Sequence, residues 1–181
     1  HNIYKHHQHV WSAISDAEQW PAQYFISTPA TSRMPEHAES MSVMCYMAYD
    51  EVQEWSATFN TKTHPNERGA AYARFKLQKE ECVLLRIESI FPGIRQHIAA
   101  VHSCTPLTWR DYLASPAGSM YGLQRDANHP LKSQLNAQTH LQNLFLTGQN
   151  LVMHGILGVS IGALVTCSHF IDRNKLLADI A

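Results

Sequence analysis

Glycines interrupt an uncharged stretch near the end of the chain, and their spacing could create a binding site for a phosphorylated or electron-rich ligand. Gly148 opens a turn, and Gly155 and Gly158 precede an apolar segment that predicts a helix from about Leu157 to Ile171. The first turn of a helix carries unpaired N–H groups and a partial positive charge, which attract pyrophosphates and the edges of electron-rich rings. Glycines in a buried helix also permit close packing, as Gly162 would here, so both interpretations stay open.

Histidine is the other residue type that could do chemistry. The chain has 12 histidines, and His6, His7 and His9 cluster near its start. A His-x-His pair on a strand can ligate a metal ion. No Cys, Asp or Glu lies within six residues of His9, so we expect a solvated stretch and no metal site. No Ser/His/Asp arrangement or carboxylate pair indicates nucleophilic or acid–base catalysis.

The glycines lie within a run of 39 residues, from Ser133 to Ile171, that contains no Asp, Glu, Lys or Arg. A transmembrane helix is one interpretation, because the run includes a Gly-x-x-x-Gly motif. Only 14 residues separate His154 from His169, which is the length of a buried helix rather than of a bilayer crossing. We therefore predict a strand at Leu144–Thr147, a glycine-rich turn, and a helix that starts between Gly155 and Val159 with an open N-terminal end.

Upstream, the hydrophobic pattern predicts strands at Tyr24–Ser27, Met41–Tyr49 and His97–Thr105. The Met41–Tyr49 segment is apolar on both faces, which indicates burial on both faces or contact with an apolar ligand. Met41–Tyr49 and His97–Thr105 are each too apolar for an edge strand of a sheet. Helices are expected over 11–20 and 69–90.

The segment that follows the third predicted strand carries signals for a helix start. Thr105-Pro106 begins a helical turn, and Thr108 and Asp111 are spaced like a capping box. Residues 115–128 read as a loop that holds Pro116, Gly118 and Gly122.

Composition excludes several classes of protein. Of the 181 residues, 45% are apolar and 16% charged, and 14 Lys and Arg against 15 Asp and Glu give a net charge of −1. This balance provides no basic surface for nucleic acid and argues against intrinsic disorder. Charged residues make up about 25% of an average soluble domain, so the low content here favours a partner surface, a missing domain or a large apolar cavity.

Cysteine usage and the first residue add two expectations. Cys45, Cys82, Cys104 and Cys167 form no CxxC motif, which favours reduced, mostly buried thiols in a cytosolic protein.

The chain begins at His1 rather than Met, so we expect a segment excised from a longer protein.

Five motifs occur in one order along the second half of the chain. They are Phe91-Pro92-Gly93-Ile94-x-Gln96-His97-Ile98, Thr105-Pro106-Leu107-Thr108, Gly118-Ser119-x-Tyr121-Gly122, Asn143-Leu144-Phe145-Leu146-Thr147-Gly148-Gln149-Asn150 and His154-Gly155-x-x-Gly158-Val159. Together they resemble the C-terminal part of the phytoene desaturase, carotenoid isomerase and retinol saturase family of FAD-dependent oxidoreductases, and most closely its bacterial retinol saturase-like members.

The resemblance implies an α+β fragment of a two-domain enzyme. Residues 1–130 would be the latter part of a sheet-based substrate domain, and 131–181 the closing strand, turn and helix of the FAD domain. Since the resemblance places Met41–Tyr49 and His97–Thr105 both in the substrate domain, we expect them in one sheet. FAD would bind mainly to an N-terminal dinucleotide-binding domain with a GxGxxG motif, which this sequence lacks. That domain would be the partner of these residues, which alone would neither hold FAD nor be active.

The resemblance also assigns site residues. Those that match the family's flavin-contacting segment are Gly148, Gln149, Asn150, Gly155, Gly158 and Val159. Many relatives carry an acidic residue just after the first glycine, whereas this chain has two amides there. The catalytic residues are unassigned; His154 and Tyr121 are candidates for proton donation if a double bond is reduced, and a structural role for each is the alternative.

The implied substrate is a polyene, carotenoid or retinoid-like apolar molecule. The alternatives are a non-catalytic module that binds a hydrophobic ligand, and a piece that docks on a membrane. We expect a cytoplasmic location, with peripheral membrane contact as the alternative.

Overall fold

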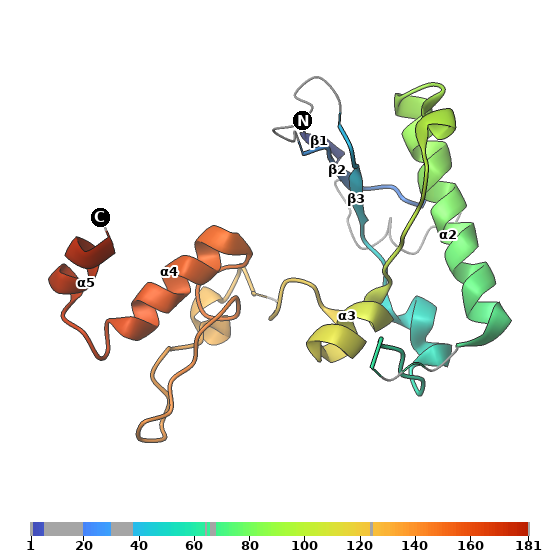
Figure 1. Cartoon of the computed structure of the whole chain (residues 1–181). Helices are drawn as coiled ribbons and strands as arrows, with labels where there is room; N and C mark the ends of the chain where they lie inside the picture. Colours follow the sequence, from blue (N-terminus) through green and yellow to red (C-terminus); the bar gives the residue numbers. More distant parts are fainter. Residues whose placement is uncertain are drawn as a thin grey trace. The chain divides into compact units, whose positions relative to one another are not determined.

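The computed structural model describes residues 2–5, 20–29, 38–63, 65, 68–123 and 125–180. Residues 11–19 of the first predicted helix, and the histidines at 6, 7 and 9, lie outside the described residues. The chain divides into two compact units, His1–Gly118 and Ser119–Ala181 (Figure 1). The assignment of 1–130 and 131–181 to parts of two enzyme domains stays a prediction.

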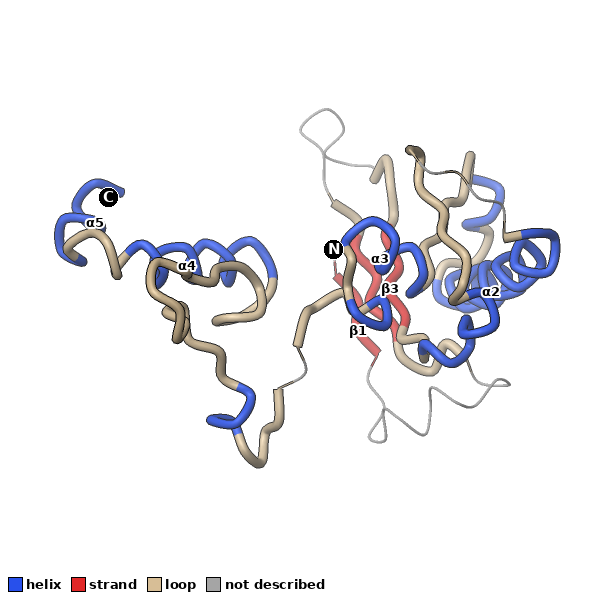
Figure 2. Tube along the Cα trace, turned by 90° about the horizontal axis from the view of Figure 1, so that it is seen from below, coloured by secondary structure: helices blue, strands red, loops and turns tan. Residues whose placement is uncertain are grey.

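A three-stranded antiparallel sheet belongs to the first unit. Its order is β1 (Asn2–Lys5), β2 (Tyr24–Ser27) and β3 (Ser42–Cys45), with β2 in the centre (Figure 2). Ile26 of β2 is 1% exposed and pairs with Val43 of β3. The strand predicted at Tyr24–Ser27 is confirmed.

The strand predicted at Met41–Tyr49 is wrong in its second half, because β3 ends at Cys45. The Tyr46 carbonyl accepts a hydrogen bond from the Trp20 indole N–H at 2.8 Å, and the Ala48 N–H donates to Glu51 Oε1 at 3.2 Å. These backbone groups are therefore not available to a ladder, and a 3₁₀-helix, η1 (Tyr49–Trp55), follows. Within the described sheet β3 is an edge strand, contrary to the expectation from its apolar pattern.

The helix predicted over 69–90 is confirmed as α2 (Gly69–Ile90). It ends before Pro92-Gly93, where Gly93 takes a left-handed conformation with φ 82° and begins the short η2 (Ile94–His97). Arg95 of η2 folds back on the helix and donates two hydrogen bonds to Glu81, at 2.8 and 3.0 Å. Pro92-Gly93 thus ends the helix, as predicted.

The strand predicted at His97–Thr105 is wrong. Residues 98–105, all of them described, have no regular secondary structure, so they share no sheet with β3. The Ile98 N–H donates a hydrogen bond to the Arg95 carbonyl at 3.2 Å, and the Ser103 hydroxyl donates to Glu80 of α2 at 2.5 Å. Side-chain contacts with α2 therefore hold this stretch where we expected a β-ladder.

The core of the first unit lies between η1, α2 and α3 (Pro106–Leu113). Val52 and Leu107 have no exposed surface, and they pack with Tyr72, which is 8% exposed. The Tyr72 hydroxyl, inside this apolar cluster, is paired with the Thr105 hydroxyl at 2.7 Å. The buried polar group of the aromatic ring is thus satisfied within the core.

The capping box of α3 lies one turn earlier than predicted. Thr105 is the N-cap, its N–H donates to Thr108 Oγ1 at 3.3 Å, and Pro106 occupies the first turn. A short 3₁₀ turn, η3 (Pro116–Gly118), follows the helix inside the predicted loop.

Asp111 is instead a buried carboxylate with no exposed side-chain surface. It accepts hydrogen bonds from Arg110 at 2.6 and 2.9 Å, from the Asn60 N–H at 2.9 Å and from Arg68. Burial alone would raise the pKa of Asp111, but the bonds from Arg110, the Asn60 N–H and Arg68 hold this pKa below its usual value. The network joins the 58–68 segment to α3, since Arg68 also donates to Thr58 Oγ1 at 2.7 Å.

The second unit contains η4 (Pro130–Ser133), α4 (Gly155–Cys167) and α5 (Arg173–Ile180). The strand predicted at Leu144–Thr147 is reduced to one antiparallel bridge, between Gln138 and Phe145. The bridge does not extend because the Leu146 carbonyl accepts from Thr166 of α4 at 2.8 Å. Among the described residues, no helix combines the length and the apolar character that a membrane crossing requires.

The four cysteines are all described and all free, as predicted, but Cys104 is exposed and the other three are half-buried. Burial raises the pKa of the Cys45 thiol to about 12. We expect iodoacetamide at pH 8 to alkylate Cys104 at least tenfold faster than Cys45, because the thiolate is the reacting species. Peptide mapping over a time course measures both rates, and equal rates would contradict the burial of Cys45.

We expect Asp111→Asn to lower the free energy of unfolding by about 3–5 kcal/mol, because it leaves the Arg68 and Arg110 guanidinium groups without their counter-charge. The depressed pKa means that Asp111 stabilises the fold above the unfolded value of about 3.9, and that this contribution is lost as pH falls through that value toward the folded pKa. Urea unfolding between pH 3 and 7 measures both effects. Asp50→Asn, at an exposed position of η1, is the control; an equal loss there would refute the argument.

Candidate functional site

The turn that leads into α4 lies directly on the small residues of that helix. A Cβ on Gly158 would lie 2.3 Å from the Met153 carbonyl oxygen, and one on Gly162 would lie 3.4 Å from the Gly148 oxygen. One turn further along, the Thr166 hydroxyl binds the Leu146 carbonyl. The backbone of 146–153 therefore runs along one face of the helix, and Gly158 and Gly162 serve packing within the chain.

The beginning of α4 is open, as predicted. The helix starts at Gly155, where nothing lies within 4 Å of a built Cβ, and Ile156 is 91% exposed. His154 is the N-cap residue and makes no side-chain capping bond. The helix ends at Cys167 rather than Ile171, and the N–H groups of His169 and Phe170 form turns by donating to the carbonyls of Thr166 and Cys167 at 3.2 and 2.9 Å. Asp172 then accepts the N–H groups of the first turn of α5.

The structure brings together the two candidate proton donors, which are 33 positions apart in the sequence. The rings of Tyr121 and His154 lie with centroids 4.3 Å apart and planes tilted by 41°. Both residues are exposed, His154 as the N-cap of α4 and Tyr121 at 45%. The pair thus borders the open helix start, where a ligand could reach it.

The two amides after Gly148 contact the loop that carries Tyr121. Asn150 Oδ1 accepts the Leu123 N–H at 2.9 Å, and Gln149 Nε2 donates to the Met120 carbonyl at 3.5 Å. These atoms are the ones that the family resemblance would direct to a flavin. In this structure they are used inside the chain.

The remaining predicted site residues divide by exposure. Gly148 takes φ +104°, and nothing lies within 4 Å of a built Cβ there. Val159 is 40% exposed, just after the first turn of α4. Gly158, in contrast, is buried against Met153. A ligand at the helix start could therefore approach the backbone at Gly148 and Gly155, whereas a substitution at Gly158 acts first on the turn.

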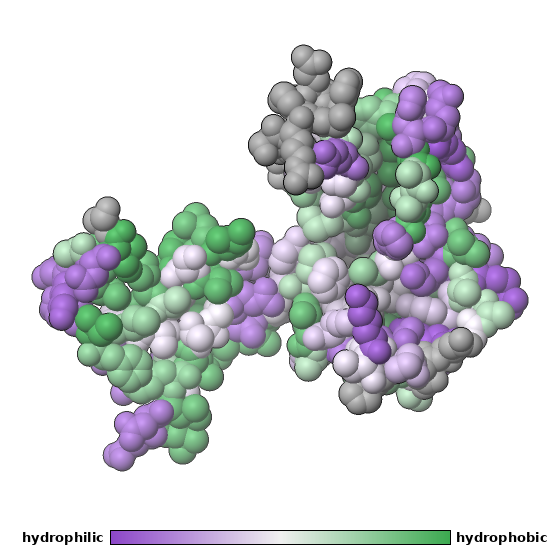
Figure 3. Space-filling view, in the orientation of Figure 1, coloured by the Kyte–Doolittle hydropathy of each residue, from purple (hydrophilic) through white to green (hydrophobic). Residues whose placement is uncertain are grey.

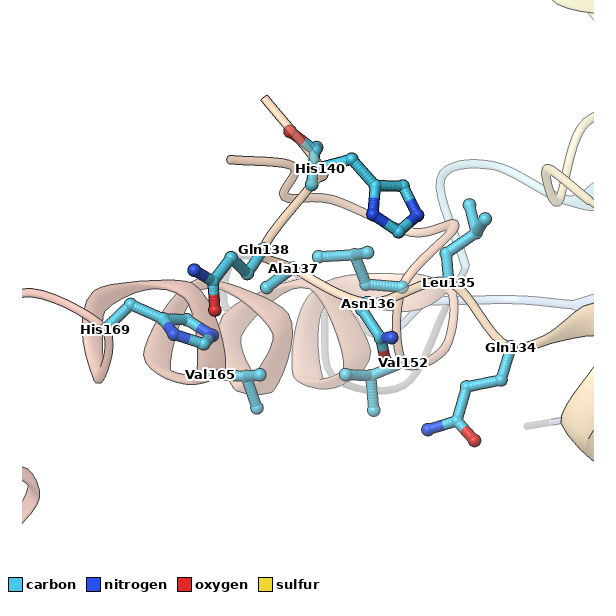
Figure 4. Close-up of a pocket in the computed structure, with 11 residues that line it drawn as sticks. Gln134, Leu135, Asn136, Ala137, Gln138, His140, Val152, Val165 and His169 are labelled. Carbon is cyan, nitrogen blue, oxygen red and sulfur yellow. The ribbon is translucent and has the colours of Figure 1, made fainter. Parts of the chain in front are cut away.

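Sequence reasoning missed a cavity of about 590 Å³ beside α4 (Figure 4). It lies between the 134–140 segment, Leu151 and Val152, and the C-terminal half of α4, and its volume is in the usual range for ligand sites. Its lining contains amides, His140 and His169 but no formally charged residue. The low charge of the chain favoured a large apolar cavity among other features, and the uncharged 133–171 run contains its lining, but neither pattern located it.

Apolar side chains are widely exposed in the second unit, which is largely green in Figure 3. Among its described residues only Ala137 and Leu151 are buried apolar side chains. Large exposed ones include Leu131 at 83%, Ile156 at 91% and Leu157 at 68%. No group of three or more metal-ligating side chains occurs in the part of the chain that the structure describes.

Comparison with known proteins finds relatives of one kind. The chain is 33% identical over 144 residues to a Homo sapiens protein named all-trans-retinol 13,14-reductase, covering 78% of the chain and 23% of that protein. Proteins of the same name from Danio rerio and Rattus norvegicus are 29% and 32% identical over 158 and 151 residues.

The chain spans about a quarter of the length of these curated relatives. No protein-family model matches the chain, and no solved structure matches it either. The comparisons therefore support the resemblance to retinol saturases, while its bacterial and C-terminal details stay predictions.

We expect Gly158→Ala to destabilise the turn by about 1–3 kcal/mol, because the added methyl group collides with the Met153 carbonyl in a packed site. Ser160→Ala, at an exposed position of the same helix, is the control. Hydrogen exchange of the 146–153 backbone amides measures the effect. Unchanged exchange in Gly158→Ala would show that the turn does not rest on this glycine.

Proposed function

We propose that the chain is part of a flavin-dependent oxidoreductase that reduces a double bond of a retinoid-like polyene. The observation that carries this proposal is the similarity to proteins that all bear one reductase name, over 78–83% of the chain. Because the chain spans about a quarter of those proteins, the activity is a proposal for the whole protein that carries it.

The start of α4 fits one wall of a flavin nucleotide site. The unpaired N–H groups of a helix N-terminus bind phosphate oxygens, and the open backbone at Gly148 and Gly155 leaves room for close approach. When bound, a reduced flavin would supply a hydride, which carries two electrons and one hydrogen to one carbon of the double bond. FAD is thus the cofactor that we propose, held by Gly148, Gly155 and the first turn of α4.

The second hydrogen of the reduction must arrive as a proton at the other carbon. A Tyr hydroxyl and a His imidazolium can each hold and donate such a proton. Tyr121 and His154 lie in contact at the open end of α4, so one can donate while the other orients it and restores its proton. The uncharged 133–171 run, to which His154 belongs, suits an apolar substrate, because a polyene brings no charge to be paired.

A non-catalytic module for a hydrophobic ligand is the second candidate. The cavity beside α4 favours it, since aliphatic and amide side chains line it without a formal charge. A neutral apolar molecule with one hydrogen-bonding end would match that lining. This candidate predicts ligand binding without a flavin and without turnover.

The full-length protein distinguishes the two candidates. We expect it to purify with a flavin spectrum and, once reduced under anaerobic conditions, to convert all-trans-retinol to a product with a shortened polyene chromophore. One of Tyr121 and His154 donates the proton, and the variant that removes it, Tyr121→Phe or His154→Gln, should lower kcat by roughly 10²–10⁴-fold, the usual contribution of a general acid. His102→Gln, at an exposed position of the first unit, is the control. A colourless protein that binds retinol and never reduces it would support the binding module.

A further inference from the structure

Hydrogen bonds hold the loop Met120–Leu123 to the turn Gly148–Leu151 on both sides of Tyr121. After Tyr121, the Leu123 N–H donates to Asn150 Oδ1 at 2.9 Å. Before it, the Met120 carbonyl accepts from Gln149 Nε2 at 3.5 Å, which is the longer and weaker bond. Two consecutive amide side chains therefore fix the backbone on which Tyr121 is mounted.

Gly122 is what allows Asn150 to reach this loop. Gly122 has φ +81°, and a Cβ built on it would lie 2.1 Å from Asn150 Oδ1. A side chain there would occupy the place of the Asn150 amide and would also strain the left-handed backbone. The Ser119 hydroxyl donates to the Gly122 carbonyl at 2.8 Å and closes the loop from within.

Arg125 holds the Gly148–Leu151 turn, which is the other partner of the contact. Its Nη2 donates to the carbonyls of Asn150 and Leu151, at 3.1 and 2.6 Å. The turn backbone is thus anchored by Arg125, while the Asn150 side chain binds the loop. The result is a fixed geometry in which the Tyr121 ring lies over His154.

We propose that Asn150 is a positioning residue that holds Tyr121 against His154, assisted by Gln149 and the space at Gly122. This inference rests on the proposed function, in which that ring pair holds the proton. In this role the side-chain oxygen of Asn150 accepts a hydrogen bond from the Met120–Leu123 loop. Asn150 acts through Tyr121 and need not touch the substrate.

Three variants of the full-length protein test the inference. Asn150→Ala removes the acceptor, whereas Asn150→Asp keeps an oxygen in the same place and is the matched control. Gly122→Ala disrupts the same contact from the loop side, because its methyl group would occupy the place of Asn150 Oδ1. Agreement between Asn150→Ala and Gly122→Ala would separate loss of the contact from any other effect of either substitution.

Hydrogen exchange provides a readout that does not need activity. We expect the Leu123 amide to exchange roughly 5- to 10-fold faster in Asn150→Ala and Gly122→Ala, in line with the loss of one hydrogen bond, and to keep the wild-type rate in Asn150→Asp. An unchanged Leu123 rate in Asn150→Ala would overturn the inference, because it would show that Asn150 does not hold the loop.

Kinetics test whether this contact serves proton transfer. We expect Asn150→Ala to lower kcat roughly 10- to 100-fold, since a displaced general acid loses part of its contribution, with KM for the polyene within about twofold. The drop in kcat with rising pH should become smaller, since less of the rate then depends on the protonated acid, and Asn150→Asp should restore both kcat and the full drop.

The remaining outcomes are also decisive. Faster Leu123 exchange with an unchanged kcat and pH profile would overturn the positioning role. A wild-type protein that reduces no polyene would overturn the proposed function instead, and the exchange rates would still decide whether Asn150 holds the loop.

Discussion

The second unit depends on the close approach of a peptide backbone to a helix. The 146–153 segment lies on the face of α4 formed by Gly158, Gly162 and Thr166, with the Met153 carbonyl occupying the space that a Cβ of Gly158 would need. Small residues at such a face let two backbones meet where side chains would hold them apart. The position of Gly148, the direction of the turn and the open start of α4 all follow from this contact.

Packing through backbone has a consequence for the side chains. When Gly158 and Gly162 form the contact face, the apolar residues next to Gly158 must point elsewhere, and Ile156, Leu157 and Val159 are exposed. The first unit is instead stabilised by side-chain packing, in which Val52, Tyr72 and Leu107 form a buried core. The two units therefore differ in packing: the second is built mainly on backbone contacts, whereas the first has a cluster of fully buried side chains.

The sequence was sufficient where a single residue type imposes a backbone constraint. Gly93 stops α2, and Gly155 begins α4, because few other residues adopt their left-handed conformations. It was insufficient where distant groups compete for the backbone. The Trp20 indole and the Glu51 carboxylate end β3 early, and no pattern within residues 41–49 reveals either partner. The capping box was displaced because Thr105, Thr108 and Asp111 offer two equivalent spacings, and only burial of Asp111 decides between them.

Competition from distant groups also explains why the sequence predicted single motifs of the candidate site but not the contacts between them. The motif around Tyr121 and the motif after Gly148 were each recognisable, but Gly122 was interpreted only as part of a loop, and Gly158 was left open between ligand approach and helix packing. In the structure Gly122 makes room for Asn150, and Gly158 makes room for Met153. Gly148 and Gly155, where a built Cβ has no close neighbour, remain as the positions at which a ligand can approach the backbone. The glycines thus divide into those that build the site and those that leave it open, a distinction that depends on neighbours distant in sequence and therefore requires coordinates.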